Sequence, residues 1–207
     1  MIDGPIKSGV VAVIRARSAV DLRPAARALV AGGVSYVEIT LTTPGATHSI
    51  RALQDVAGCV VGAGTVLDVA AARDVIAAGA RFVVSPAFDT EVLACCKERG
   101  VPYVPGAFTP TEIVTAQRAG ADLIKLFPAS AVGPSYIRDV LAPLPSVRLI
   151  PSGGVTLENA GDWIRAGAAA VSLGSALVSE PLLAPAGAAE LTARARALVA
   201  SVARARA

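Results

Sequence analysis

Eight short apolar runs alternate along the chain with longer alanine-rich segments, and this alternation constrains the fold more than any other feature of the sequence. We expect the runs to be strands; they span residues 10–14, 34–41, 59–64, 81–85, 102–105, 122–127, 147–151 and 169–174. Most of the segments between them end in glycine close before the next run, which is typical of helix C-termini. Strands that alternate with helices form a parallel sheet covered by those helices, so the sequence predicts an α/β fold.

Eight strand–helix units favour one α/β architecture in particular, the (β/α)8 or TIM barrel. No linker or shift in composition divides the 207 residues, so we expect a single compact domain over residues 1–207. Hydrophobic residues make up 54% of the chain and aromatic residues only 4%, which predicts an interior of small and branched side chains. A doubly wound open sheet is the alternative architecture.

The charge of the chain says which partners to expect. The net charge of +3 is spread along the sequence, except for Arg194, Arg196, Arg204 and Arg206, which we interpret as the solvated face of a last helix and not as a nucleic-acid arm. No uncharged run reaches the roughly 20 residues that span a bilayer, and the N-terminus lacks the apolar region of a signal peptide. We therefore expect a cytoplasmic protein with no nucleic-acid and no membrane partner.

Residues that usually bind metals are scarce. His48 is the only histidine, and Cys59, Cys95 and Cys96 form no CxxC motif. Such cysteines are typically small buried hydrophobes in a reducing compartment, and a zinc site would lack its favoured ligands. We therefore expect neither a metal nor another cofactor.

The active site of a (β/α)8 barrel lies at the C-terminal ends of its strands, so polar residues there are the candidates. Side chains alternate between the two faces of a strand. This alternation predicts that Glu38 in the second strand, and Lys125 and Phe127 in the sixth, point into the barrel. Glu38 and Lys125 could form an ion pair that only sets packing. Buried pairs add little to stability, because desolvation offsets the attraction, so we favour a chemical role.

Two further polar residues directly follow predicted strands. Arg15 follows the first strand, where it could hold a carboxylate or phosphate or could simply extend along the surface. Thr65 follows the third strand, where its hydroxyl could bind a carboxylate or cap the next helix. The sequence leaves these alternatives open.

Two glycine-bearing loops follow the seventh and eighth strands: "PSGGV" (151–155) and "LGSAL" (173–177). Backbone N–H groups at glycines can approach an anion closely, and the loops after these two strands are the recurrent phosphate site of the barrel. The alternative is that the glycines only make tight turns.

A lysine among apolar neighbours can be neutral part of the time and attack a carbonyl carbon. The resulting carbinolamine dehydrates to a protonated Schiff base, which accepts the electrons of a neighbouring C–C bond. A nearby carboxylate can carry the protons. Lys125 and Glu38 together therefore suit an aldol cleavage that needs no metal.

Seven motifs, in order from about residue 10 to residue 178, carry a family resemblance: "AGGVSYVEITLTTPGA", "VGAGTVL", "VSPAF", "VPGAFTPTE", "IKLFPAS", "PSGGVTLEN" and "SLGSAL". The sequence resembles the KHG/KDPG aldolases, class I enzymes that cleave 4-hydroxy-2-oxoglutarate or 2-dehydro-3-deoxy-6-phosphogluconate. The resemblance implies pyruvate and D-glyceraldehyde 3-phosphate as products of the phosphorylated substrate, and pyruvate and glyoxylate as products of the other. It also implies a homotrimer that acts on a small 2-keto acid.

The same resemblance implies a role for each matching residue. Lys125 would be the Schiff-base lysine and Glu38 the acid/base residue, with Thr65 against the pyruvate portion and Phe127 in its apolar wall. The residues that would hold the phosphate are Gly153, Gly154, Gly174 and Ser175.

One substrate-binding position departs from part of the family. Many members have arginine four residues after the catalytic glutamate, where this chain has Thr42. Other branches have Thr or Asn there and an arginine at the end of the first strand, and Arg15 fits that pattern. Those branches include aldolases for the galactonate-derived epimer, so the configuration at C4 stays open.

Two other functions fit the same barrel. A phosphosugar isomerase or epimerase would use the phosphate loops with a pair of acid/base residues and would not need the amine. A non-catalytic sugar-phosphate binding protein would need the pocket but neither Glu38 nor Lys125.

Overall fold

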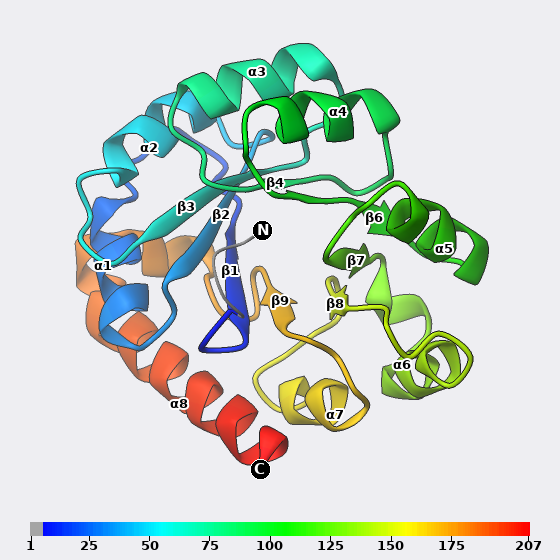
Figure 1. Ribbon diagram of the computed structural model, residues 1–207. Coiled ribbons are helices and arrows are strands. Elements are labelled where there is room, and N and C mark those ends of the chain that lie inside the picture. The colour runs from blue at the N-terminus through cyan, green and yellow to red at the C-terminus, as the bar shows by residue number, and fades with distance from the viewer. Residues whose placement is uncertain (1–5) are drawn as a thin grey trace.

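The computed structural model describes residues 6–207, in which eight α-helices surround a centre of short strands (Figure 1). The strands are β1 (Val10–Ile14), β2 (Tyr36–Thr40), β3 (Val60–Gly64), β4 (Val83–Val84), β5 (Tyr103–Val104), β6 (Gly106–Ala107), β7 (Ile124–Leu126), β8 (Leu149–Pro151) and β9 (Val171–Leu173). The α-helices are α1 (Arg23–Ala31), α2 (Ala46–Leu53), α3 (Val69–Ala77), α4 (Thr90–Glu98), α5 (Pro110–Arg118), α6 (Pro134–Leu141), α7 (Ala160–Arg165) and α8 (Ala188–Arg206). Three 3-10 helices complete the described elements: η1 (Ala129–Ala131), η2 (Glu180–Leu183) and η3 (Pro185–Gly187).

All strand pairings among the described residues are parallel, and they form two sheets. One sheet has six strands in the order β5-β4-β3-β2-β1-β9, and the other has three in the order β6-β7-β8. The helices lie outside the strands in Figure 1. The predicted α/β fold with parallel strands is confirmed.

The strand predicted over residues 102–105 is wrong in its extent. The structure has two strands of two residues here, β5 and β6, which lie on either side of Pro105 and belong to different sheets. Proline has no N–H to donate to a ladder, so a sheet readily ends at it. The Pro105 carbonyl still accepts a hydrogen bond from the Lys125 N–H, at 2.8 Å. At the other end of the two sheets, a single parallel bridge joins Ser152 to Ser172.

The buried side chains form two clusters on opposite faces of the strands. The larger lies between the strands and the helices and contains residues such as Leu29, Ile39 and Ile113. The smaller lies on the inner face; it comprises Ile6, Val11, Phe82, Val84, Val104, Leu123, Ile150 and Ala170. Period-two alternation produces this division, because Val11 faces inward while Val10 and Ala12 face the helices.

Several helices begin at side-chain caps, which fix the loops at the C-terminal ends of the strands. The Asp68 carboxylate accepts from the Ala71 N–H at 2.7 Å at the start of α3, and Asp89 caps α4 in the same way. Thr109 and Glu112 form a capping box at the start of α5. These caps satisfy backbone donors that have no partner within the helix.

The C-terminal helix α8 is 19 residues long and packs against α1 and α7. Arg206 is exposed, in line with the predicted solvated face, and it also donates hydrogen bonds to the carbonyls of Lys7 at 3.2 Å and Ala169 at 2.8 Å. Arg206 thereby ties the segment before β1 to the loop before β9. Among the helices of residues 6–207, none combines the length and apolar character that a bilayer crossing requires.

Candidate active site

A cavity of about 860 Å³ opens at the C-terminal ends of the strands. Nine of the ten predicted site residues line it: Arg15, Glu38, Thr65, Lys125, Phe127, Gly153, Gly154, Gly174 and Ser175. Thr42 is the exception. The ends of β1, β2, β3, β7, β8 and β9 therefore bring together residues that are up to 160 positions apart in the sequence, from Arg15 to Ser175.

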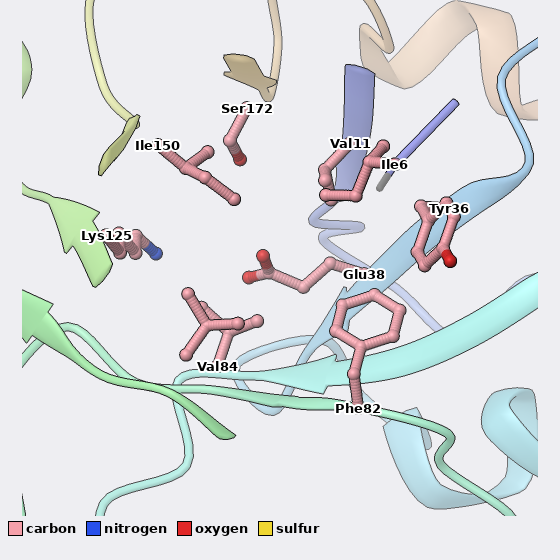
Figure 2. Close-up of a pocket in the computed structure, with 10 residues that line it drawn as sticks. Ile6, Val11, Tyr36, Glu38, Phe82, Val84, Lys125, Ile150 and Ser172 are labelled. Carbon is pink, nitrogen blue, oxygen red and sulfur yellow. The ribbon is translucent and has the colours of Figure 1, made fainter. Parts of the chain in front are cut away.

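Glu38 and Lys125 point toward the same space from β2 and β7 (Figure 2). Both are buried, with 1% and 8% of their surface exposed. The Lys125 ammonium lies 5.0 Å from the centre of the Phe127 ring, a cation–π distance. Phe127 itself is 36% exposed and lines the same cavity as the amine.

The carboxyl group of Glu38 lacks the partners that a buried acid normally has. Among the described residues, no group donates a hydrogen bond to its Oε1 atom. Burial raises the pKa of Glu38, and the positive charges of Lys125 and Arg15 oppose this rise without cancelling it. A carboxyl in this setting takes up and releases a proton closer to neutral pH than an exposed one does.

Two glycines of β3 make room for this arrangement. A Cβ atom at Gly64 would lie 1.8 Å from Glu38 Oε1, and one at Gly62 would lie 2.5 Å from the Phe82 ring. Sequence reasoning treated these glycines only as the residues before Thr65. Their spacing of two along an inward face was the signal that could have identified them.

A second cavity, of about 20 Å³, lies beneath the first. Glu38, Lys125 and Ser172 line both cavities, so these three side chains form the floor of the site (Figure 2). The rest of the small cavity is walled mostly by apolar side chains such as Val84 and Ile150. Sequence reasoning missed Ser172, although a serine with the same parity as Gly174 in an apolar strand pointed to it.

Thr42 is exposed and belongs to a network of hydroxyl groups beside the cavity. Its Oγ1 lies 3.0 Å from Thr40 Oγ1, which in turn lies 3.3 Å from Thr43 Oγ1. Thr43 Oγ1 accepts a hydrogen bond from the Ala16 N–H at 3.2 Å. The network therefore ties the end of β2 to the backbone directly after Arg15.

The structure excludes one of the two interpretations of Thr65, the helix cap. The cap of the following helix is Asp68, so Thr65 does not cap it. Thr65 has a φ of 61° and is the only non-glycine residue with positive φ among those described. Such strained backbone persists only where its surroundings impose it, and it clusters at functional sites.

The glycine loops offer free backbone donors. Gly153 and Gly154 both have a φ of 82°, which side-chain-bearing residues rarely adopt. Within residues 6–207, no hydrogen bond uses the backbone N–H groups of Gly153, Gly154, Gly174 or Ser175. These donors line the large cavity and are available to an anion.

Two charged residues that sequence reasoning missed also line the cavity. Arg17 and Glu180 are both exposed, and the Arg17 N–H lies 3.2 and 3.3 Å from the two carboxylate oxygens of Glu180. This contact joins segments 163 residues apart, so no local pattern could have revealed it. In the described part of the chain, no group of three or more His, Cys, Asp or Glu side chains is placed to hold a metal ion.

Comparison with known proteins gives consistent matches. A family model described as KDPG and KHG aldolase matches residues 3–193. The 2-dehydro-3-deoxy-phosphogluconate aldolase of Treponema pallidum (strain Nichols) is 41% identical over 157 residues, 75% of each chain. The 2-dehydro-3-deoxy-6-phosphogalactonate aldolase of Escherichia coli (strain K12) is 40% identical over 153 residues, which cover 72% of this chain and 75% of the relative.

A solved structure with bound ligand also matches. It is a KDPG aldolase from Legionella pneumophila with pyruvate captured as a covalent carbinolamine intermediate. It superposes with a TM-score of 0.83 at 29% sequence identity and covers 96% of this chain and 99% of its own.

Proposed function

We propose that this chain, which belongs to the KDPG and KHG aldolase family, is a class I aldolase that cleaves 2-dehydro-3-deoxy-6-phosphogluconate to pyruvate and D-glyceraldehyde 3-phosphate. One observation carries the proposal. One cavity is lined by the buried Lys125, by the buried Glu38, whose Oε1 has no hydrogen-bond donor, and by free backbone N–H groups. The names of the relatives at about 40% identity support the same substrate class.

The reaction begins at the Lys125 amine, which attacks the C2 carbonyl of the substrate. Loss of water from the carbinolamine leaves a protonated imine. The Glu38 carboxylate then takes the proton of the C4 hydroxyl, the C3–C4 bond breaks, and its electron pair moves into the imine to give an enamine. The aldehyde departs, Glu38 returns the proton to C3, and hydrolysis of the imine releases pyruvate and the free amine.

The missing partner of Glu38 Oε1 suits this role. A carboxyl that already accepted strong hydrogen bonds from the protein would be a weaker base toward the C4 hydroxyl. Here burial raises its pKa, and one oxygen stays free of protein donors. General acid–base catalysis is most effective when the pKa lies near the working pH.

The ends of the substrate would bind to different parts of the cavity. We assign the carboxylate to Arg15 and Thr65 and the pyruvate methylene to the Phe127 ring, with the phosphate on the free N–H groups of the glycine loops. Thr42 lies outside the cavity, which favours Arg15 over it as the anion contact.

We infer that β5 and β6 are the two halves of one strand divided at Pro105, so that the two sheets act as one closed eight-stranded barrel. We further infer that this barrel is a single domain over residues 1–207 that works as a homotrimer in the cytoplasm. The shared boundary at Pro105 and the bridge between Ser152 and Ser172 support closure, because they join the sheets at both ends. The trimer rests on the family resemblance. Cys59, Cys95 and Cys96 are free thiols, which suits a reducing compartment.

The galactonate-derived epimer is the second candidate substrate. The combination of Thr42 with Arg15 and the 40% identity to the Escherichia coli phosphogalactonate aldolase favour it. Relative cleavage rates for the phosphorylated gluconate, its galactonate epimer and 4-hydroxy-2-oxoglutarate would rank the three substrates.

Trapping the imine tests the reaction class. Treatment with pyruvate and borohydride should leave a stable adduct on the Lys125 peptide, which mass spectrometry would detect. The control is Lys97, an exposed lysine that donates a hydrogen bond to the Ala119 carbonyl, whose peptide should carry no adduct. Folded protein without an adduct would favour an isomerase, an epimerase or a non-catalytic binding protein. Activity should survive a chelator, and a large loss would indicate a metal-dependent aldolase.

A further inference from the structure

Arg17 stands on the rim of the large cavity, where the loop after β1 meets the loop after β9. Its backbone N–H binds the Glu180 carboxylate at 3.2 and 3.3 Å. The loop that ends at Glu180 begins with Gly174 and Ser175, which have free backbone donors. Arg17 is therefore anchored to the segment that carries half of the candidate phosphate donors.

Three cations line the cavity, one of them buried and two exposed. Lys125 is buried, at 8% exposure, and Arg15 is the first residue after β1. The charges of both act on the Glu38 carboxyl. Arg15 and Arg17 are both exposed, and Arg17 lies two residues further along the chain from the end of β1.

The Arg17 guanidinium has no protein partner. Within residues 6–207 it makes neither a hydrogen bond nor an ion pair, although its own backbone holds a carboxylate. By contrast, Arg23, the first residue of α1, is paired with Asp21 at 2.9 Å. The fork of five donors on Arg17 is thus available to a ligand in the cavity.

We propose that the Arg17 guanidinium binds the phosphate group of the substrate, beside the backbone N–H groups of Gly174 and Ser175. This inference rests on the proposed function and adds a selectivity residue that acts at the end of the substrate opposite Lys125. A phosphate dianion matches the planar guanidinium fork in geometry and charge. The positive charge also offsets the repulsion that Glu180, on the same rim, exerts on a phosphate.

A matched pair of substrates tests the assignment. We would measure steady-state cleavage of 2-dehydro-3-deoxy-6-phosphogluconate and of 2-dehydro-3-deoxygluconate, which differs only in lacking the phosphate. Arg17→Gln should raise KM for the phosphorylated substrate by about tenfold, the loss expected for one charge-assisted hydrogen bond. It should change kcat/KM for the unphosphorylated substrate by less than about twofold, and Arg17→Lys should give a smaller rise in KM.

The control is Arg27→Gln, which removes an exposed arginine of α1 that lines none of the cavities described above and should leave both substrates unaffected. Inorganic phosphate should inhibit the wild type competitively and the Arg17→Gln variant about tenfold more weakly. Equal losses on both substrates would overturn the assignment, as would no loss on either. Failure of the proposed function itself would look different, because the wild type would then cleave neither substrate and form no borohydride adduct.

Discussion

Gly64→Ala should disable the site while leaving the fold intact. The added Cβ would stand 1.8 Å from Glu38 Oε1, 2.5 Å from Cδ and 2.7 Å from Cγ. Real Cβ atoms do not approach other atoms within 3.0 Å, so the carboxyl must retreat by more than 1 Å. Glu38 is 1% exposed, and its room to move is the cavity floor that it shares with Lys125 and Ser172.

The expected magnitudes follow from which atoms can give way. The end of a glutamate side chain can move, so the stability cost should stay near that of ordinary overpacking, about 1–3 kcal/mol. For a chain of this length that corresponds to a fall in Tm of about 2–12 °C. A displacement of about 1 Å at a catalytic group costs on the order of 10²-fold in rate, so kcat should fall by about that factor.

Gly62→Ala is the matched control. It adds the same methyl group to the same face of β3, but its Cβ would meet the Phe82 ring at 2.5 Å and not Glu38. We expect comparable or greater destabilisation with kcat within about threefold of wild type. The assays are pyruvate release and thermal unfolding of both variants. If folded Gly64→Ala kept wild-type kcat, or if Gly62→Ala lost as much activity, the position of Glu38 would not control the rate.

Three further predictions concern the other members of the site. Lys125→Arg should abolish turnover and borohydride trapping, whereas Lys97→Arg should retain both; an adduct in the first variant would exclude Lys125 as the nucleophile. Burial raises the pKa of Glu38 in the folded state above 4.5, so above this pH folded Glu38 keeps a proton that the unfolded chain has lost. The free energy of unfolding should therefore fall as the pH rises from about 4.5 through the raised pKa. Glu38→Gln should flatten this dependence in urea melts at several pH values, and an unchanged slope would assign it to other groups. Thr43→Val removes the acceptor of the Ala16 N–H and should raise KM by about 3- to 10-fold by displacing Arg15, whereas Thr43→Ser should restore the wild-type KM. The rise in KM caused by Thr43→Val should vanish in an Arg15→Ala background, and additive effects of the two substitutions would contradict the coupling.

Sequence reasoning performs well where a strict periodicity operates. The period of two along the strands placed Glu38 and Lys125 on inward faces, and both line the cavity. The first strand was predicted over the same residues as β1, because apolar β-branched residues fill it. The fold class and the convergence of distant strands can be predicted from such periodic patterns, because the periodicity reflects the geometry of the backbone.

Contacts between loops lie beyond that periodicity. The Arg17–Glu180 hydrogen bond spans 163 residues and the Ala16–Thr43 bond spans 27, and each depends on how two irregular segments fold back. The division of the fifth strand at Pro105 was missed for a related reason. The run "PYVP" is apolar throughout, but its proline cannot donate to the ladder, so the sheet ends there although hydrophobicity continues.

The surroundings of Glu38 argue for a chemical role over a structural one. Glu38 Oε1 is buried without a hydrogen bond from the protein, which costs about 1–3 kcal/mol of stability. Gly64, which faces this oxygen, has no side chain to pack against its neighbours and also lowers stability. Neither cost is offset by a hydrogen bond from the described residues to Oε1. Both are explained if the missing partner is the C4 hydroxyl of a substrate held by Lys125, because a carboxylate already hydrogen-bonded to the protein would be a weaker base toward that hydroxyl.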